Sequence, residues 1–145
     1  RRHLRGDSPS DLGRRAQAIM IYLASPYHHP DPLVRAERLA QAEDAMHHLL
    51  PHKVFSPIAH NGRASERFGA QTPSIYLLFD FEILSKCTAL CVLEIPGWNT
   101  SRGVLMEVGY AIANNIELRI ARKLKSTWVW RTVKAPELLD LIYKE

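Results

Sequence analysis

An almost unbroken apolar run, ALCVLEI at residues 89–95, constrains the fold of this chain most strongly. Only Glu94 interrupts the run, and Pro96-Gly97 ends it. A strand that is apolar at nearly every position needs cover on both faces, and such strands occur in parallel sheets between layers of helices. The run therefore predicts a central strand of an α/β fold.

Further short apolar runs alternate with segments of helical spacing. We expect the other strands near residues 19–24, 53–56, 116–120 and 127–133. Helices are expected over residues 31–50, 72–86 and 102–114 and from residue 135 onward. Asp31-Pro32 and Thr72-Pro73 each supply an N-cap and an opening proline, and Pro136 opens the last helix. Asn114-Asn115 is a plausible helix C-cap. We expect residues 57–69 to form a polar loop.

This alternation predicts one α/β domain, with a mostly parallel sheet of about five strands and helices on both faces, as in flavodoxin-like and Rossmann-like folds. The domain is expected to span residues 20–145, and residues 1–19 to be a flexible tail. In such folds, ligands bind at the carboxyl ends of the strands. The loops expected to meet there are residues 25–30, 56–61 and 96–102.

The charge distribution argues against a nucleic-acid partner. The chain has 19 basic and 15 acidic residues, a net charge of +4. Five arginines and two aspartates in residues 1–19 supply +3, so residues 20–145 carry 14 basic and 13 acidic residues, or +1. A nearly neutral domain lacks the basic groove that a phosphate backbone requires.

The composition excludes other classes of protein. No apolar run approaches the roughly 18 residues of a membrane-spanning helix, so we expect a cytoplasmic protein without a membrane partner. Cys87 and Cys91 are too few for a disulfide framework and are expected to be buried thiols. The histidines lack metal-ligand spacing and no phosphate-binding glycine motif is present, so we expect neither metal nor cofactor.

Residues 93–113, LEIPGWNTSRGVLMEVGYAIA, carry the most chemical information. The apolar strand leads through a Pro-Gly turn into a helix in which Gly103 and Gly109 flank Glu107. Glycine within a helix costs about 1 kcal/mol relative to alanine, so two glycines near one carboxylate suggest close approach by a ligand or another backbone. The alternative is that Glu107 is an ordinary solvated residue of the helix.

Three elements, in this order, resemble the nucleoside 2-deoxyribosyltransferase superfamily. They are IYLASPY at residues 21–27, Asp80 in the middle helix, and SRGVLMEVGYA at residues 101–111. The resemblance covers roughly residues 21–120. That superfamily also includes nucleoside 5′-monophosphate N-glycosidases, so the resemblance implies action on the N-glycosidic bond of a nucleoside or nucleotide.

Carried over residue by residue, the resemblance implies that Glu107 attacks C1′ of the sugar and forms a glycosyl-enzyme intermediate. Tyr22 would orient that carboxylate, and Asp80 would assist proton transfer near the departing base. An oxocarbenium-like transition state suits this division, because a carboxylate stabilises it and a protonated base departs more easily. Neighbouring carboxyl groups also tend to titrate apart, which leaves one ionised and one protonated.

The sequence departs from the superfamily pattern at two positions. Thr88 stands where members commonly have an aspartate. Ser101 stands where the transferases carry an aspartate and the nucleotide-cleaving members carry a serine. The resemblance thus implies a phosphorylated substrate, held by Ser101, Arg102 and Gly103 at the start of the helix. A simple N-cap is the alternative role for Ser101.

Three residues complete the expected binding site. Ser25 and Asn61 lie in the other two converging loops. Trp98 is a candidate to stack on the base, although packing is the more common role of a tryptophan beside a strand end.

The sequence is therefore interpreted as an N-glycosidase or deoxyribosyltransferase. A non-catalytic nucleotide-binding or sensing module on the same fold is the main alternative, and a structural protein with a solvent-exposed Glu107 is a third. Members of the superfamily commonly complete each pocket with a neighbouring subunit. The resemblance thus also implies a homodimer or larger homo-oligomer, with the apolar face of the 72–86 helix as one candidate surface.

Overall fold

The computed structural model describes residues 20–49, 52–68 and 73–144. The expected tail, residues 1–19, and the expected helix cap at Thr72 lie outside these ranges. Among the helices in the described part of the chain, none is both long and apolar enough to cross a membrane.

Five strands form one sheet, in the spatial order β2-β1-β3-β4-β5. They are β1 (Met20–Ala24), β2 (Lys53–Phe55), β3 (Ala89–Leu93), β4 (Glu117–Leu124) and β5 (Thr127–Val133). β1 pairs in parallel with β2 and β3, β3 pairs in parallel with β4, and β4 pairs antiparallel with β5. The expected mostly parallel α/β sheet is confirmed, with one antiparallel strand at its edge.

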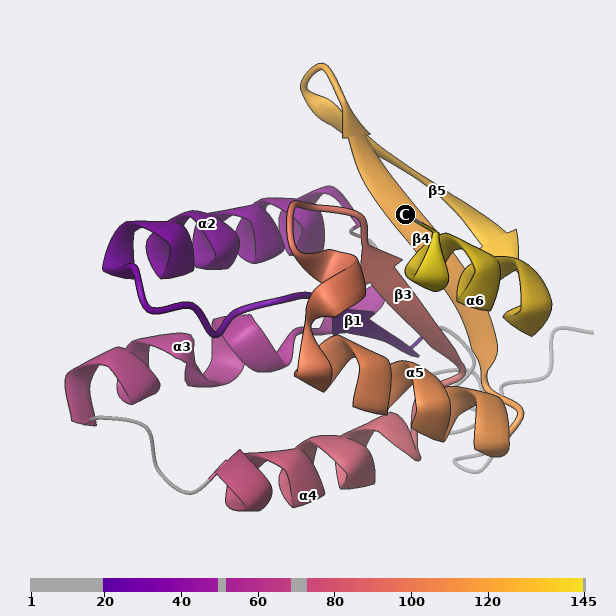
Figure 1. Cartoon of the computed structure of the whole chain (residues 1–145), viewed down its shortest axis with the longest axis horizontal. Coiled ribbons are helices and arrows are strands. Elements are labelled where there is room, and N and C mark those ends of the chain that lie inside the picture. The colour runs from indigo at the N-terminus through magenta and orange to yellow at the C-terminus, as the bar shows by residue number, and fades with distance from the viewer. Residues whose placement is uncertain (1–19, 50–51, 69–72, 145) are drawn as a thin grey trace, which may run out of the picture.

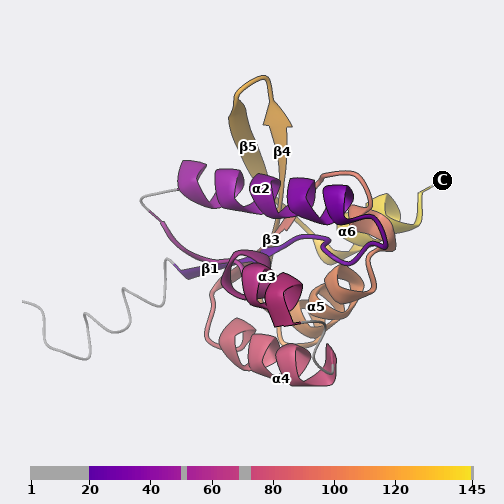
Figure 2. The same cartoon turned by 90° about the vertical axis from the view of Figure 1, so that its left-hand side faces the viewer.

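Helices cover both faces of this sheet (Figures 1 and 2). They are α2 (Pro32–His48), α3 (Pro57–Phe68), α4 (Pro73–Leu84), α5 (Arg102–Ala113) and α6 (Ala135–Tyr143), with a 3-10 turn η1 at Trp98–Thr100. Figure 2 shows α2 on one side of the strands and α4 and α5 on the other. This arrangement confirms the expected double-sided cover.

Alternation along the central strands divides the core in two. Ile21 and Leu23 of β1 belong to a cluster with Ala45 of α2, whereas Tyr22 and Ala24 belong to the cluster of α4, α5 and α6. β3 is buried at every position, as the apolar run predicts. Tyr22 is therefore directed to the face that α5 covers.

The connections place a topological switch between β1 and β3. The chain leaves β1 through α2 and reaches β2 on one side, and it leaves β3 through α5 and reaches β4 on the other. Ligands of open α/β sheets bind outside the carboxyl ends of the strands at such a point. The segments that follow β1, β2 and β3 begin at this edge of the sheet, which is where the sequence places the site.

Local signals fix the helix ends. The Asp31 side chain accepts a hydrogen bond from the Leu33 N–H at 2.9 Å and caps α2, which opens on Pro32. Asn114 is the C-cap of α5, and Asn115 follows with a left-handed φ of 57°. Both caps were expected from the sequence.

The expected polar loop at residues 57–69 is wrong, because residues 57–68 form α3. Ser56 Oγ accepts a hydrogen bond from the Ala59 N–H at 3.0 Å, and Pro57 opens the helix. Gly62 permits close packing, since a Cβ there would lie 3.3 Å from Leu39 Cδ1 of α2. Ser56-Pro57 marks the start of α3 in the sequence, as Asp31-Pro32 marks the start of α2. The many polar residues of α3 make its helical spacing hard to recognise.

Candidate active site

A buried hydrogen bond joins the two residues that the resemblance pairs. The Tyr22 hydroxyl, on β1, donates to Glu107 Oε2, on α5, at 2.5 Å. The Tyr22 side chain is completely buried, and Glu107 is only 7% exposed. The hydrogen bond links β1 directly to α5.

Glu107 occupies a position that an apolar residue would normally hold. The buried residues of α5 are Val104, Glu107, Val108 and Ala111, a stripe with helical spacing that faces the sheet. The interpretation of Glu107 as a solvated helix residue is therefore wrong. A solvent-exposed Glu107 would have favoured the third interpretation, a structural protein, and Glu107 is instead buried.

Asp80 lies close to this pair. It is the buried polar residue of α4, 8% exposed, and its charge acts on both Tyr22 and Glu107. β1, α4 and α5, which are separated in the sequence, thus bring the three expected catalytic residues together. Carboxyl groups are seldom buried this deeply, and those that are belong to ion pairs or to functional sites.

Burial raises the pKa of both carboxyl groups. For Glu107 the pKa rises to about 8, because burial and the Asp80 charge outweigh the Tyr22 hydrogen bond, which lowers it. Burial raises the pKa of Asp80 to about 6, although the nearby His60 lowers it. The pKa of the Tyr22 hydroxyl is raised far above its usual value by burial and by Glu107.

The two carboxyl groups titrate apart as expected, but in the opposite order to the assigned roles. Asp80, the expected proton donor, has the lower pKa, and Glu107, the expected nucleophile, has the higher one. Between about pH 6 and pH 8 the pair therefore holds one proton, mostly on Glu107.

Two buried side-chain oxygens in the described part of the chain have no hydrogen-bond partner, namely Ser25 Oγ and Asp80 Oδ1. An unsatisfied buried polar atom costs about 1–3 kcal/mol. Such atoms call for an explanation, and a bound ligand or an ordered water supplies one. Both residues were singled out from the sequence, and Ser25 directly follows β1.

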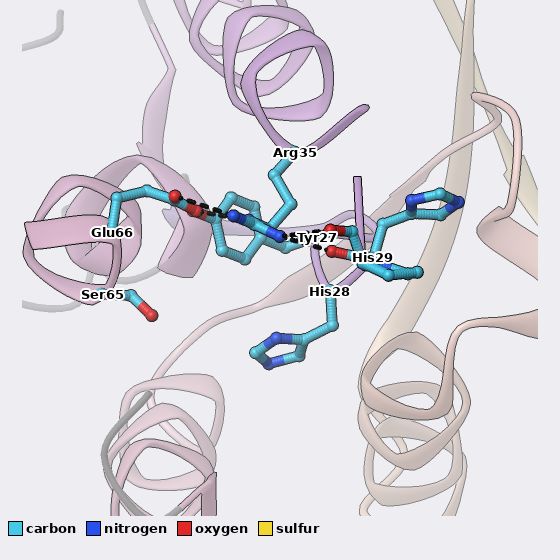
Figure 3. Close-up of a pocket in the computed structure, with 7 residues that line it drawn as sticks. Tyr27, His28, His29, Arg35, Ser65 and Glu66 are labelled. Carbon is cyan, nitrogen blue, oxygen red and sulfur yellow. Dashed lines mark hydrogen bonds and ion pairs between the residues drawn. The ribbon is translucent and has the colours of Figure 1, made fainter. Parts of the chain in front are cut away.

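A hollow of about 90 Å³ opens beside Asp80. Its lining includes Asn61 and Gly62 of α3. It shares Tyr27, His28 and Ser65 with a second hollow of about 600 Å³, so the two adjoin. Figure 3 shows the larger hollow, with Arg35 reaching toward Glu66. Neither hollow is lined by Glu107 or Tyr22, which lie in the core.

The expected phosphate-binding residues lie at the start of α5. Ser101 is the N-cap of this helix, and its Oγ accepts a hydrogen bond from the Val104 N–H at 3.3 Å. Arg102 and Gly103 are exposed. The N-cap role of Ser101 is thus present, and a role in phosphate binding remains a proposal.

The glycines of α5 do not make the close approach expected within the chain. A Cβ at Gly103 would meet only Ser101 Oγ, at 3.9 Å, and a Cβ at Gly109 would meet no atom within 4 Å. Trp98 also departs from its candidate role in stacking. It is 8% exposed and belongs to the buried cluster that contains Leu138 and Ile142 of α6, so its ring packs in the core.

Sequence reasoning missed several residues around the site. Tyr27 and Glu66 form a hydrogen bond, and Glu66 also pairs with Arg35. His60 stacks on Phe79, with ring centroids 5.8 Å apart. The misassigned loop explains most of these omissions, because the helical phase of α3 decides which of its residues face Asp80.

The described residues contain no group of three or more His, Cys, Asp or Glu side chains that could hold a metal ion. Cys87 and Cys91 are free and buried, as expected.

Comparison with known proteins identifies a family. The model of the family described as "Domain of unknown function (DUF1937)" matches residues 19–122, which include all of the candidate site. A search of curated proteins finds no match.

Proposed function

The chain belongs to the DUF1937 family, and from its site we propose that it cleaves or transfers the N-glycosidic bond of a nucleoside or nucleoside 5′-monophosphate. Glu107 is the nucleophile, Tyr22 orients it, and Asp80 exchanges the proton. The observation that carries this proposal is the buried 2.5 Å hydrogen bond from Tyr22 to Glu107. A glutamate placed in the apolar stripe of a helix and held by a tyrosine on the neighbouring strand costs stability, and a chemical role explains why it is there.

The reaction has two steps. In the first, a Glu107 oxygen bonds to C1′ while the C1′–N bond breaks, and the base nitrogen keeps the electron pair and takes a proton from Asp80. In the second, water attacks C1′, Glu107 departs as a carboxylate, and Asp80 takes a proton from the water. A second base in place of water makes the reaction a transfer.

The scheme uses the less populated placement of the pair's single proton, because the pKa of Glu107 is the higher of the two. The first step requires Glu107 to be ionised and Asp80 to be protonated, which is one distribution of the single proton that the pair holds. The hydrogen bond from Tyr22 favours the ionised form of Glu107. The unpaired Ser25 Oγ and Asp80 Oδ1 are groups that a sugar or base can satisfy.

The same proposal includes assembly into a homodimer or larger homo-oligomer. The hollow beside Asp80 is narrow, about 90 Å³, and it adjoins an open hollow of about 600 Å³. Leu78 and Phe79 of α4 are 70% and 44% exposed on the helix that carries Asp80. A second subunit on this helix would enlarge the wall of the pocket.

The proposal also includes a cytoplasmic location, with which the two free thiols accord.

Base release tests the proposal. The full chain is incubated with a panel of nucleosides and their 5′-monophosphates, and free base is followed by chromatography. We expect release from at least one substrate, and we expect Glu107→Gln to abolish it. Glu82→Gln, on the exposed side of α4, serves as the matched control and should retain wild-type activity. No release from any substrate, or full activity of Glu107→Gln, contradicts the proposal.

One observation favours a second candidate function. With a pKa of about 8, Glu107 is mostly protonated at neutral pH, which suits a hydrogen-bonding role in a nucleotide-binding or sensing module. Equilibrium binding of a nucleotide from the same panel, without base release, identifies that function.

A further inference from the structure

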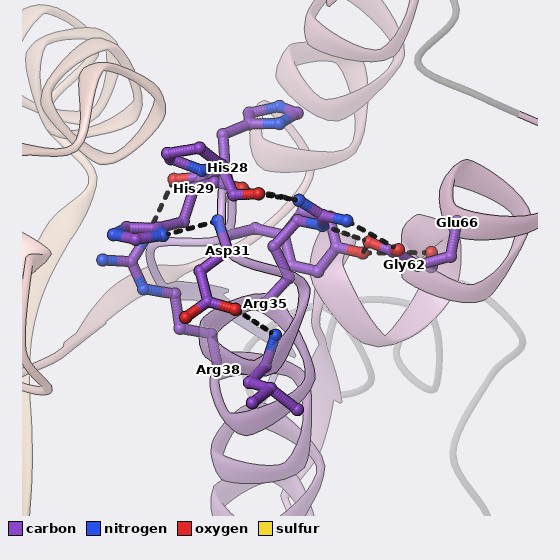
Figure 4. A network of polar contacts seen from close by, with 10 residues as sticks. His28, His29, Asp31, Arg35, Arg38, Gly62 and Glu66 are labelled. Carbon is purple, nitrogen blue, oxygen red and sulfur yellow. Dashed lines mark hydrogen bonds and ion pairs between the residues drawn. The ribbon is translucent and has the colours of Figure 1, made fainter.

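Two arginines of α2 reach into the loops at the candidate site. Arg38 NH1 donates to the His28 carbonyl oxygen at 2.8 Å, and Arg38 NH2 lies 3.5 Å from that of Pro96. Arg35 NH1 donates to the carbonyl oxygens of His29 and Pro30, at 2.6 and 3.3 Å. Figure 4 shows both guanidinium groups against the same turn of backbone.

Arg35 is also bound on its other side. Its Nε and NH2 donate to the two Glu66 carboxylate oxygens, at 2.6 and 3.1 Å, in a bidentate pair between α2 and α3. Glu66 accepts a further hydrogen bond from the Tyr27 hydroxyl. The loop that follows β1 is thereby tied to α2 and α3.

The loop that follows β3 is shaped to admit Arg38. Gly97 has a φ of +91°, a left-handed conformation that favours glycine. A Cβ at Gly97 would lie 2.3 Å from Arg38 NH2, far inside van der Waals contact. The backbone conformation at position 97 favours glycine, and the Arg38 guanidinium occupies the space that a Cβ would need.

The two loops that Arg38 joins carry the proposed binding groups. They follow β1 and β3, which are neighbours in the sheet with Ala24 opposite Val92. The first loop begins with Ser25, whose buried Oγ has no partner, and the second leads to Ser101 and the start of α5. Arg38 therefore contacts both of the loops that lead to the proposed binding groups.

We propose that Arg38 is a positioning residue that holds the β1 and β3 loops at the spacing required to bind substrate, with Arg35 and Glu66 fixing the first loop on α3. This inference rests on the proposed function for the identity of the substrate. The planar guanidinium can bond two acceptors in different directions, whereas a lysine ammonium lacks that fork. Arg38→Lys therefore keeps the charge and loses the bridge.

The first test is independent of activity. Hydrogen–deuterium exchange is measured on the full chain for the wild type, Arg38→Ala, Arg38→Lys and the control Arg63→Ala. Arg63 is 80% exposed and makes only a loose ion pair with Glu43, at 3.7 Å. We expect both Arg38 variants to speed exchange in residues 25–31 and 97–101 together, and Arg63→Ala to change neither segment. If exchange in residues 97–101 stays at the wild-type rate in the Arg38 variants, the proposal that Arg38 links the two loops is overturned.

The second test is kinetic and uses a substrate that the wild type cleaves. Arg38→Ala should raise KM by roughly tenfold, the loss of a charge-assisted hydrogen bond, and Arg38→Lys should do nearly the same. The value of kcat should change little, because the Tyr22–Glu107 pair lies on β1 and α5. A lower melting temperature with unchanged KM shows a merely structural role and overturns the proposal. If the wild type has no activity, the proposed function is contradicted. Hydrogen–deuterium exchange alone then tests whether Arg38 links the two loops.

Discussion

Glu107 combines a cost in stability with a chemical use. Its pKa of about 8 in the folded chain compares with about 4.5 in a free side chain. A carboxyl group whose pKa is higher in the folded than in the unfolded chain stabilises the fold at pH values below its unfolded pKa. That stabilisation is lost as the pH rises through the folded pKa. The fold should therefore weaken between about pH 5 and pH 8 because Glu107 must ionise in the core.

The variant Glu107→Gln should escape this loss. Glutamine stays neutral, has a similar shape and can accept the hydrogen bond from Tyr22. Its melting temperature relative to that of the wild type should rise between pH 6.5 and pH 8, above the Asp80 pKa of about 6, and level off above the Glu107 pKa of about 8. Thermal unfolding followed by circular dichroism measures the difference. A difference that stays constant over this window contradicts the burial of an ionising Glu107.

The pH dependence of catalysis also depends on the pKa values of Asp80 and Glu107. Because activity requires the Asp80–Glu107 pair to hold one proton, kcat/KM should be bell-shaped, with limbs near pH 6 and pH 8. Tyr22→Phe removes the hydrogen bond that lowers the pKa of Glu107, so the limb governed by Glu107 should move to higher pH as the maximum falls. Initial rates of base release across pH 4.5–10 test this. A profile that Tyr22→Phe leaves in place shows that Tyr22 only fills the core.

The sequence analysis selected Glu107 by its two flanking glycines and by the resemblance, and those glycines make no close contact within the chain. The break that Glu107 makes in the stripe of Val104, Val108 and Ala111 is a further signal that the sequence carries. The order of the two pKa values was not predictable, because it depends on how deeply each carboxyl group lies and on the proximity of His60.

At the scale of elements, the start of α5 has two possible uses. Ser101 caps the helix, and the same N-terminus is a suitable place for a 5′-phosphate. Aspartate is as good an N-cap as serine but repels a phosphate. Ser101→Asp should thus preserve the melting temperature, lower kcat/KM for monophosphates sharply and spare unphosphorylated nucleosides.

Ser101→Ala is the companion variant. It should cost about 1–3 kcal/mol in transition-state binding of monophosphates, as for a lost hydrogen bond to a charged group. The measurement is kcat/KM for matched pairs of nucleoside and monophosphate. Equal losses for both members of a pair would mean that Ser101 is an N-cap alone.

Elements with a strong pattern were predicted well, and α3 was not. The apolar strand β3 and the helices α2 and α5 follow from burial and caps that the sequence displays. α3 is amphipathic and packs on α2 at Gly62, a contact between segments distant in the sequence, but its many polar residues favoured the interpretation as a loop. The hollow beside Asp80 could not be foreseen without α3.

At the scale of the whole molecule, the proposed assembly depends on exposed apolar side chains. Leu78 and Phe79 of α4 and Met106 of α5 are 70%, 44% and 38% exposed. We expect the full chain to sediment as a homodimer or larger oligomer, and Leu78→Glu to shift it toward monomer with loss of activity. Analytical ultracentrifugation over a range of concentrations measures this. A dilute monomer with full activity refutes the assembly and leaves the chemistry at Glu107 intact.

The covalent intermediate on Glu107 is the central claim. A substrate with fluorine at C2′ in place of hydroxyl destabilises the oxocarbenium-like transition states of both steps, which slows breakdown of a glycosyl-enzyme. The wild type is treated with such analogues of the nucleoside and monophosphate that it cleaves, and intact mass and peptide mapping follow. We predict an increase equal to the glycosyl group, located on Glu107 and absent from Glu107→Gln. Stoichiometric base release without any adduct, or an adduct on another residue, contradicts this mechanism.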